Sequence, residues 1–314
     1  MVDNTVEIFL KKFSDFAMTF IGLTLAAIPF VIFGVVVSIL IANYVKPSSI
    51  LKYKSKNVVV SHIQSMFIGL FLPVCECGNI PLAKRLSLVG FRPSEVITFM
   101  LAAPIFNPIV LVTTLVAFNL DYNVAILRIF IGAFIALFVG LVFSFSSDQK
   151  SLLVETTAQK TNFSFSQSQD FQEECFIDNS SLIDSFRDEF FNVFKMLLIG
   201  CFVASIFQIL IPRELFNIFA NSPTLSVLAL IALAFVISIC SSIDAFFALS
   251  LASVFNLGSI IAFLVFGPMI DIKSLMMLST IFRPKTLAIM SLLVTILSLI
   301  AGLSVNYFYK TNYF

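Results

Sequence analysis

The chain has 314 residues, of which 59% are hydrophobic and 12% are charged, and its formal net charge is +1. A soluble domain is about half apolar and roughly one quarter charged, so this composition excludes an ordinary soluble core and indicates a membrane protein. The small net charge gives no case for nucleic-acid binding, and five cysteines are too few for a secreted disulfide framework.

The first half contains uncharged runs of the length that crosses a bilayer, separated by short basic loops. In chain order, the expected segments are 16–45, 57–75, 80–90, 96–120 and 129–147. Segment 80–90 is too short to cross alone and carries Lys84 and Arg85. Pro104 and Pro108 interrupt segment 96–120, so we expect a broken helix there.

Residues 148–187 are rich in Ser, Gln, Asp and Glu, and we expect a solvated, partly disordered linker. Beyond it the apolar pattern resumes, with expected segments 190–211, 223–241, 243–255, 258–270 and 286–309. The chain therefore divides into a first membrane unit (1–147), the polar linker (148–187) and a second membrane unit (188–314).

The two units match at a nearly fixed spacing. Four residues recur 164 positions later: Phe99, Pro104, Leu111 and Phe118 correspond to Phe263, Pro268, Leu275 and Phe282. The polar Asn107 corresponds to Asp271 at the same spacing. Cys75 precedes Cys240 by 165 positions, and Gly34 precedes Gly200 by 166. A duplicated unit is the simplest account.

Equivalent loops change from basic to non-basic between the units, which predicts that the repeats are inverted in the membrane. Three spans plus one hairpin in each unit would produce that inversion, with the hairpins at 57–90 and 223–256. Four full spans in each unit would give parallel repeats instead. We therefore expect an all-α, polytopic integral membrane protein with pseudo-symmetric repeats and broken or hairpin helices.

Each expected hairpin has a polar tip. At the first, Gly78 allows an unusual backbone conformation, Asn79 suits a helix N-cap, and Pro81 suits the first turn of the helix that follows. At the second, Ser242 is the expected N-cap and Asp244 the first-turn acid. Two helix starts facing one another near the midplane would form a polar site between the repeats.

The residue types at the tips and breaks suggest three kinds of chemistry. Cysteine thiolates favour soft metals or metalloids, although free cysteines also pack as small apolar residues. Carboxylates at membrane depth favour binding or coupling of a cation or proton, although they also cap helices. The polar residues after the proline breaks favour a solute pathway, with a packing kink as the alternative. The candidate substrate-binding residues are Cys75, Glu76, Cys77, Gly78, Asn79, Pro81, Pro104, Asn107, Pro108, Cys240, Ser241, Ser242, Asp244, Pro268 and Asp271.

These motifs resemble the predicted-permease family that includes the ArsP-like organoarsenical efflux permeases. The resemblance rests on residues 73–82, 102–108, 240–246 and 267–271 followed by Lys273, which cover both units in the family's order. It implies a permease with a central polar linker. Glu76 stands where the family usually has a small polar residue between the two cysteines, and a carboxylate there would alter a thiolate site.

We therefore expect a permease that moves a small molecule or ion, such as a soft metalloid or metal species, through a midplane site in the lipid bilayer. The membrane is that of a bacterium or, given 38 Phe and no Trp, of an organelle such as a plastid. We expect no cofactor, no resident metal and no catalytic residue. The alternatives are a membrane thiol oxidoreductase using the Cys-x-Cys pair and a non-transporting scaffold or assembly factor.

Overall fold

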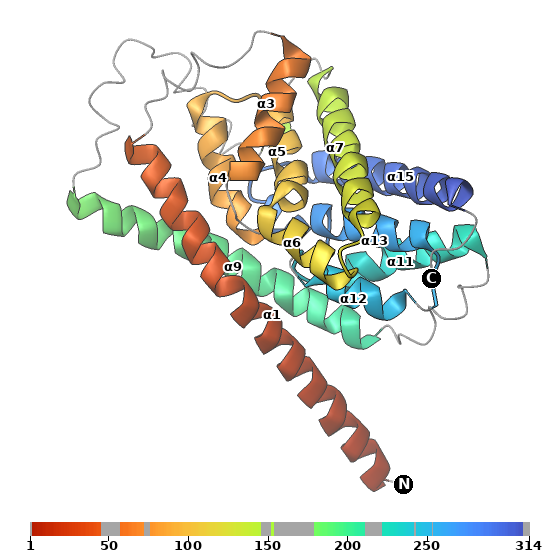
Figure 1. Ribbon diagram of the computed structural model, residues 1–314. Coiled ribbons are helices and arrows are strands. Elements are labelled where there is room, and N and C mark those ends of the chain that lie inside the picture. The colour runs from red at the N-terminus through yellow and green to blue at the C-terminus, as the bar shows by residue number, and fades with distance from the viewer. Residues whose placement is uncertain are drawn as a thin grey trace.

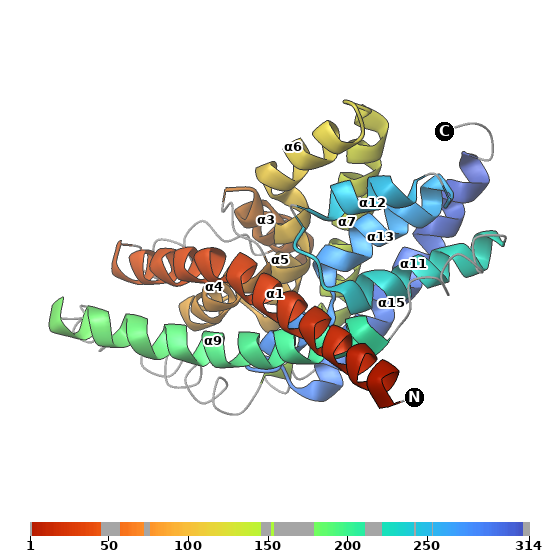
Figure 2. The same ribbon diagram turned by 90° about the horizontal axis from the view of Figure 1, so that it is seen from below.

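The computed structural model describes residues 2–44, 57–71, 76–145, 152–153, 179–210, 222–241, 243–252 and 254–309. The elements of the first half are α1 (Val2–Tyr44), α3 (Val58–Phe71), α4 (Glu76–Val89), α5 (Pro93–Phe106), α6 (Pro108–Ala117) and α7 (Tyr122–Ser144). Those of the second half are α9 (Asn179–Leu210), α11 (Pro223–Ile237), α12 (Asp244–Leu251), α13 (Leu257–Met269), α14 (Ile272–Leu278) and α15 (Pro284–Phe308). The expectation of an all-α fold is confirmed (Figures 1 and 2).

Within the described ranges, 6 helical segments are long and apolar enough to cross a membrane. Three lie in each half, namely Ser14–Leu40, Pro93–Ala117, Tyr122–Ser144, Phe190–Gln208, Leu257–Leu278 and Pro284–Phe308. The apolar parts of α3 and α11 are shorter, at Val58–Leu70 and Pro223–Ile237. This distribution agrees with three spans and a shorter helical pair in each half.

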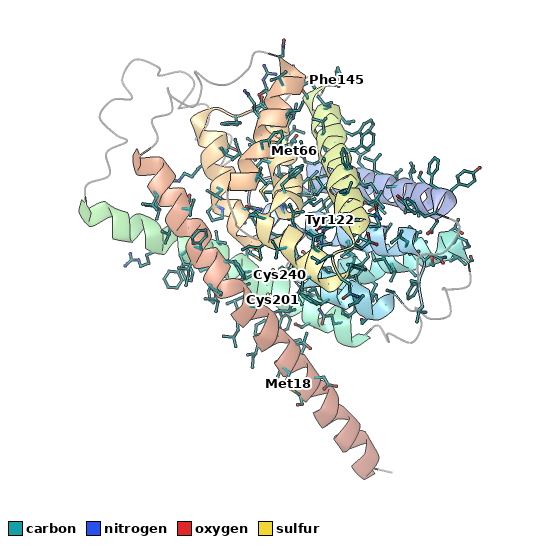
Figure 3. All side chains as sticks on the ribbon, viewed as in Figure 1. Met18, Met66, Tyr122, Phe145, Cys201 and Cys240 are labelled. Carbon is teal, nitrogen blue, oxygen red and sulfur yellow. The ribbon has the colours of Figure 1, made fainter. Side chains whose placement is uncertain are left out.

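The outer surface of the long helices is strongly apolar. On α7, Phe130, Phe134 and Phe138 are exposed and follow one another at the four-residue spacing of a single helix face. Tyr122 and Phe145 lie at opposite ends of α7, as Figure 3 shows, and both are exposed. A helix with an apolar outer face suits lipid as its solvent, and aromatic residues at its ends suit the two membrane interfaces.

The same packing pattern recurs in both halves. Helix α5 packs against both α3 and α7, and α13 packs in the same way against α11 and α15. Three pairs of equivalent helices join the halves, since α1 contacts α9, α5 contacts α13 and α7 contacts α15. The packing therefore follows the internal match that the sequence revealed.

The two expected helix breaks are present. Asn107 separates α5 from α6, and its Oδ1 accepts a hydrogen bond from the Ile109 backbone N–H at 2.9 Å. Asp271 is the N-cap of α14, and its Oδ1 accepts from the Ser274 backbone N–H at 2.5 Å. Asn107 and Asp271, which the 164-residue spacing pairs, therefore have the same local role. The side chain of each accepts a hydrogen bond from a free N–H group at the start of a helix.

The helix starts at the two tips differ from the prediction. Helix α4 begins at Glu76, so Asn79 lies within its first turns instead of capping it, and Pro81 lies inside the helix. A proline there removes one backbone hydrogen bond, and the favourable position of the Glu76 carboxylate at the positive helix end offsets part of that loss. Helix α12 begins at Asp244, which is therefore in the first turn, as expected. Its N-cap residue is Ile243, however, and not the expected Ser242.

Two helices extend beyond the predicted apolar segments. Helix α1 begins at Val2, and α9 begins at Asn179, so residues 179–187 of the expected linker are helical. Hydropathy detects only the apolar part of such a helix. Elsewhere in the linker, Leu152 and Leu153 are buried, and their carbonyl groups accept hydrogen bonds from Arg283 at 3.1 Å and Thr286 at 3.2 Å.

Candidate functional site

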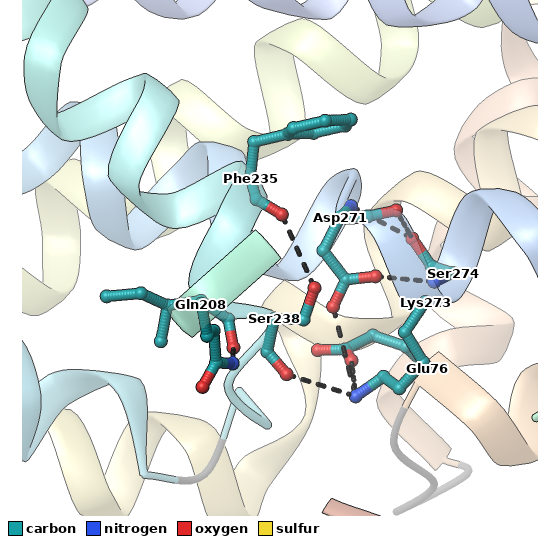
Figure 4. A network of polar contacts seen from close by, with 8 residues as sticks. Glu76, Gln208, Phe235, Ser238, Asp271, Lys273 and Ser274 are labelled. Atoms are coloured by element: carbon teal, nitrogen blue, oxygen red, sulfur yellow. Dashed lines mark hydrogen bonds and ion pairs between the residues drawn. The ribbon is translucent and has the colours of Figure 1, made fainter. Parts of the chain in front are cut away.

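A buried group of charged residues lies where the starts of α4 and α14 meet the end of α11 (Figure 4). The Lys273 Nζ atom is 3.7 Å from Glu76 Oε2 and 3.8 Å from Asp271 Oδ2, and it donates to the Ser238 carbonyl oxygen at 3.4 Å. All four residues are almost fully buried. We call Glu76, Ser238, Asp271 and Lys273 the central cluster; Glu76 comes from the first half and the other three come from the second.

Local backbone structure places these groups together. Helix α11 ends because Ser238 adopts the left-handed conformation, with φ of 50°, that commonly terminates a helix. The Gln208 side-chain amide of α9 donates to the carbonyl of Ile237, which satisfies one of the free carbonyl groups at that helix end. The negative end of α11 therefore faces the Lys273 ammonium, which is a favourable arrangement.

Two glycines let the long helices approach the cluster closely. A Cβ atom on Gly34 of α1 would lie 2.6 Å from the Gly78 Cα atom at the start of α4. A Cβ atom on Gly200 of α9 would lie 3.1 Å from the Lys273 Cα atom. The internal match between the halves paired these two glycines. Each allows the first helix of its half, α1 or α9, to pack against the start of a helix that contributes to the cluster, α4 or α14.

Three thiols lie within electrostatic range of Lys273. Cys77 at the start of α4, Cys201 on α9 and Cys240 after α11 each interact electrostatically with the Lys273 ammonium. Cys201 and Cys240, which Figure 3 labels, therefore belong to the same part of the molecule. Within the described ranges, no three His, Cys, Asp or Glu side chains converge closely enough to hold a metal ion.

A second buried ion pair also joins the halves. Arg128 of α7 donates from its two terminal nitrogens to both carboxylate oxygens of Asp244 on α12, at 3.2 and 2.5 Å. One of these nitrogens also donates to Thr114 Oγ1 of α6 at 2.7 Å. Arg128 is completely buried. Because both carboxylate oxygens are bound in a two-pronged geometry, this pair is a strong link between the halves.

The structure brings some of the predicted site residues together. Glu76 and Asp271 face each other across Lys273, and Cys77 and Cys240 interact electrostatically with Glu76. Asn79 follows Glu76 by one helical turn and is fully buried. Among the described residues, the start of α4 and the segment that follows α11 therefore lie near one another. Cys75 and Ser242, which were expected in the same site, lie outside the described residues.

Other predicted site residues have local structural partners. Asp244 is held by Arg128, and the Asn107 side-chain oxygen caps α6. Pro108 is exposed at the start of α6, while Pro104 and Pro268 are buried within α5 and α13. The Pro81 carbonyl oxygen accepts from Ser38 at 3.5 Å. Ser241 is buried next to Cys240, and its hydroxyl has no hydrogen-bond partner.

Sequence reasoning missed the basic partners. Arg128 directly precedes the expected segment 129–147, but it lies inside α7 and is completely buried. Lys273 was part of a motif without an assigned role, and Cys201, inside the expected segment 190–211, was not among the candidate site residues. The sequence did contain a signal for these partners, namely a basic residue beside or within an apolar segment. Charged residues at membrane depth usually face an oppositely charged partner or a cavity.

Comparisons with known proteins agree with this architecture. A family model described as "Predicted permease", of the ArsP-like type, matches residues 12–307. The chain is 33% identical over 307 residues to the Bacillus subtilis (strain 168) protein named "UPF0718 protein YcgR", covering 94% of this chain and 98% of that one. It is 31% identical over 287 residues to a Streptococcus mutans protein named "Putative two-component membrane permease complex subunit", covering 90% and 93%.

No solved structure matches the chain. The family match spans nearly the whole chain, and the bacterial relatives match it over nearly their full lengths. Together with the six apolar helical segments, these matches make the protein an integral, multi-pass membrane protein, and the bacterial relatives favour the bacterial inner membrane over an organelle. The chain belongs to the ArsP-like family of predicted permeases.

Proposed function

We propose that this permease moves a small solute through the central cluster, at the contact between two membrane units (1–147 and 188–314) that are inverted relative to one another. One observation carries the proposal: Lys273 of the second half is buried between Glu76 of the first half and Asp271. Charged side chains are expensive at membrane depth and usually mark a solute or ion pathway.

The solute class follows from the groups around Lys273. The thiols of Cys77, Cys201 and Cys240 offer soft ligands that suit a metalloid or soft metal species as cargo. The ammonium of Lys273 offers a counter-charge for an anionic group. The relatives' names support transport over the thiol oxidoreductase and scaffold alternatives, since one of them is named as a permease subunit.

Transport into vesicles tests the proposal directly. Purified protein in proteoliposomes is tested for uptake and efflux of metalloids, soft metals and organic anions, with Cys77→Ser and Glu76→Gln beside the wild type. We expect transport of at least one solute and a loss of about tenfold or more in Glu76→Gln. The matched control is Glu95→Gln, because the Glu95 carboxylate is also buried but accepts from Ser61 at 2.7 Å, away from the cluster. Equal loss in both variants would contradict a role for the cluster as the solute site.

Thiol labelling tests the pathway without knowledge of the solute. Cys77 is kept as the single cysteine, and the other four of the five cysteines are replaced by serine. A membrane-impermeant thiol reagent should modify Cys77 from one side of the membrane, and a variant with all five cysteines replaced by serine is the control for background labelling. No modification of Cys77 from either side would contradict a water-accessible route to the cluster.

The Streptococcus mutans relative is named as a subunit of a two-component complex. We extend this to the present chain as a second part of the proposal, namely that it works with a partner subunit. A higher transport rate per protein molecule in native membrane vesicles than in proteoliposomes that contain only this chain would support the partner. Equal rates per protein molecule in the two preparations would show that the chain works alone.

A further inference from the structure

The central cluster carries an excess of negative charge. Two carboxylates, Glu76 and Asp271, share the single ammonium of Lys273, and its Nζ atom is 3.7 and 3.8 Å from the nearest oxygen of each. Charge-assisted hydrogen bonds are usually about 2.7–2.9 Å long. Lys273 therefore lies between the two carboxylates without forming a short bond to either, and one buried negative charge is left without a counter-charge in the cluster.

Several oxygen atoms of the cluster also have no hydrogen-bond donor. Both carboxylate oxygens of Glu76 and the Oδ2 atom of Asp271 are buried and have no hydrogen-bond partner. The Arg128–Asp244 pair provides the comparison within the same molecule, because there both carboxylate oxygens accept hydrogen bonds. Most buried polar groups in proteins are hydrogen-bonded, so three such oxygens near one lysine point to a site for a positively charged ligand.

Asn79 supplies an independent observation. It is fully buried, and neither its amide oxygen nor its amide nitrogen has a hydrogen-bond partner. Asn79 follows Glu76 by three residues, so both side chains lie on the same face of α4. This face points toward α14, because Glu76 forms an ion pair with Lys273 of that helix. An amide oxygen on this face would complement the carboxylates as a neutral ligand.

The backbone adds an acceptor of the same kind. Helix α11 ends at Ile237, and the Ser238 carbonyl oxygen points toward the Lys273 ammonium at 3.4 Å, as Figure 4 shows. Carboxylate, amide and carbonyl oxygens are the ligands that hard cations prefer. Interrupted membrane helices use such backbone carbonyl groups to bind sodium ions in secondary transporters.

We propose that the central cluster binds one sodium ion, held by the Glu76 carboxylate, Asp271 Oδ2 and the Asn79 amide oxygen, with the Lys273 ammonium displaced toward the Ser238 carbonyl group. A proton would neutralise the excess charge but would satisfy only one of these oxygens, whereas a metal cation contacts several at once. Binding of sodium does not require transport; its use to drive solute movement rests on the proposed function.

Equilibrium binding of radioactive sodium to the purified full chain tests the proposal. We expect about one ion per chain, displaced by unlabelled sodium and not by choline. Glu76→Gln keeps the shape of the side chain and removes its charge, and Asp271→Asn also keeps the oxygen that caps α14. Both variants should lose sodium affinity by about tenfold or more, whereas Glu95→Gln should bind as the wild type does.

Lys273→Met separates ion binding from a structural role of the lysine. Removal of the competing ammonium should raise the sodium affinity, and sodium should then raise the thermal midpoint of this variant more than that of the wild type. Binding of sodium that is unchanged in Glu76→Gln and Asp271→Asn would overturn the proposal. Absence of sodium binding by the folded wild type between pH 6 and pH 9, with transport driven by a proton gradient alone, would overturn the ion assignment while leaving the proposed permease function intact.

Discussion

Replacement of Arg128 by methionine leaves the Asp244 carboxylate buried without its partner. The wild-type pair has two nitrogen–oxygen contacts of 3.2 and 2.5 Å, and Arg128 also donates to Thr114. Removal of one partner of a buried ion pair costs about 3–5 kcal/mol, because the remaining charge has lost its compensation. For a domain of 150–250 residues, about 1 kcal/mol corresponds to about 2–4 °C, so we expect a decrease of about 10 °C in the thermal midpoint.

A second replacement should restore most of that loss. In Arg128→Met combined with Asp244→Leu, neither position carries a charge, and exchange of a buried pair for apolar residues is often neutral or stabilising. The double-mutant cycle should therefore show a coupling of about 2 kcal/mol or more between the two positions. Thr114→Val is the control: it removes the hydroxyl's hydrogen bonds from Arg128 and to the Val110 carbonyl oxygen but leaves the ion pair, and it should cost about 1–2 kcal/mol.

The assay must follow helix content in detergent, because the chain has no tryptophan for intrinsic fluorescence. Circular dichroism on heating measures the midpoint for the wild type, both single variants and the double variant. The reasoning would be refuted if the two single losses simply added in the double variant, since additivity means that Arg128 and Asp244 do not interact. A loss below about 1 kcal/mol in Arg128→Met would have the same meaning, because it would resemble an exposed pair.

Two further predictions concern backbone packing and helix capping. Gly34→Ala should lower the yield of folded protein, because the added Cβ would lie 2.6 Å from the Gly78 Cα atom; Gly22→Ala on the same helix is the control, since nothing lies within 4 Å of its added Cβ. Size-exclusion chromatography of detergent extracts compares them, and equal yields would argue against the close contact of α1 with α4. Asn107→Ala should lower the thermal midpoint by an amount equivalent to about 1 kcal/mol, because it removes the N-cap of α6, whereas Asn107→Asp keeps the accepting oxygen and should cost less. Identical midpoints for the wild type and Asn107→Ala would show that the cap contributes nothing.

The sequence predicted most of the helical framework because membrane spans are set by composition and length. Uncharged runs located the long helices, and Pro104 and Pro268 marked the broken ones. The pairing of Asn107 with Asp271 predicted equivalent positions, and both residues cap a helix after a break. These features depend on local sequence, where a short window contains the physical cause.

The contents of the site were harder to predict because they depend on partners that are distant in sequence. Arg128 and Asp244 are 116 positions apart, so no local pattern connects them. Glu76 and Asp271 were chosen for their charge, but the lysine between them was not assigned a role. The start of α4 was also misplaced, because Asn79 and Pro81 have the residue types of a helix start even though the helix begins earlier.

The two ion pairs that join the halves also bear on how the protein is made. Glu76 and Arg128 are synthesised before their partners Lys273 and Asp244, and the Arg128–Asp244 separation of 116 residues corresponds to roughly 10 s of translation. During that interval the nascent first half contains an acid and a base that have no partners in the bilayer. A cell that produced only this half would therefore contain an incompletely folded membrane protein. Membrane chaperones and quality-control proteases that recognise this form would then influence the amount of folded permease.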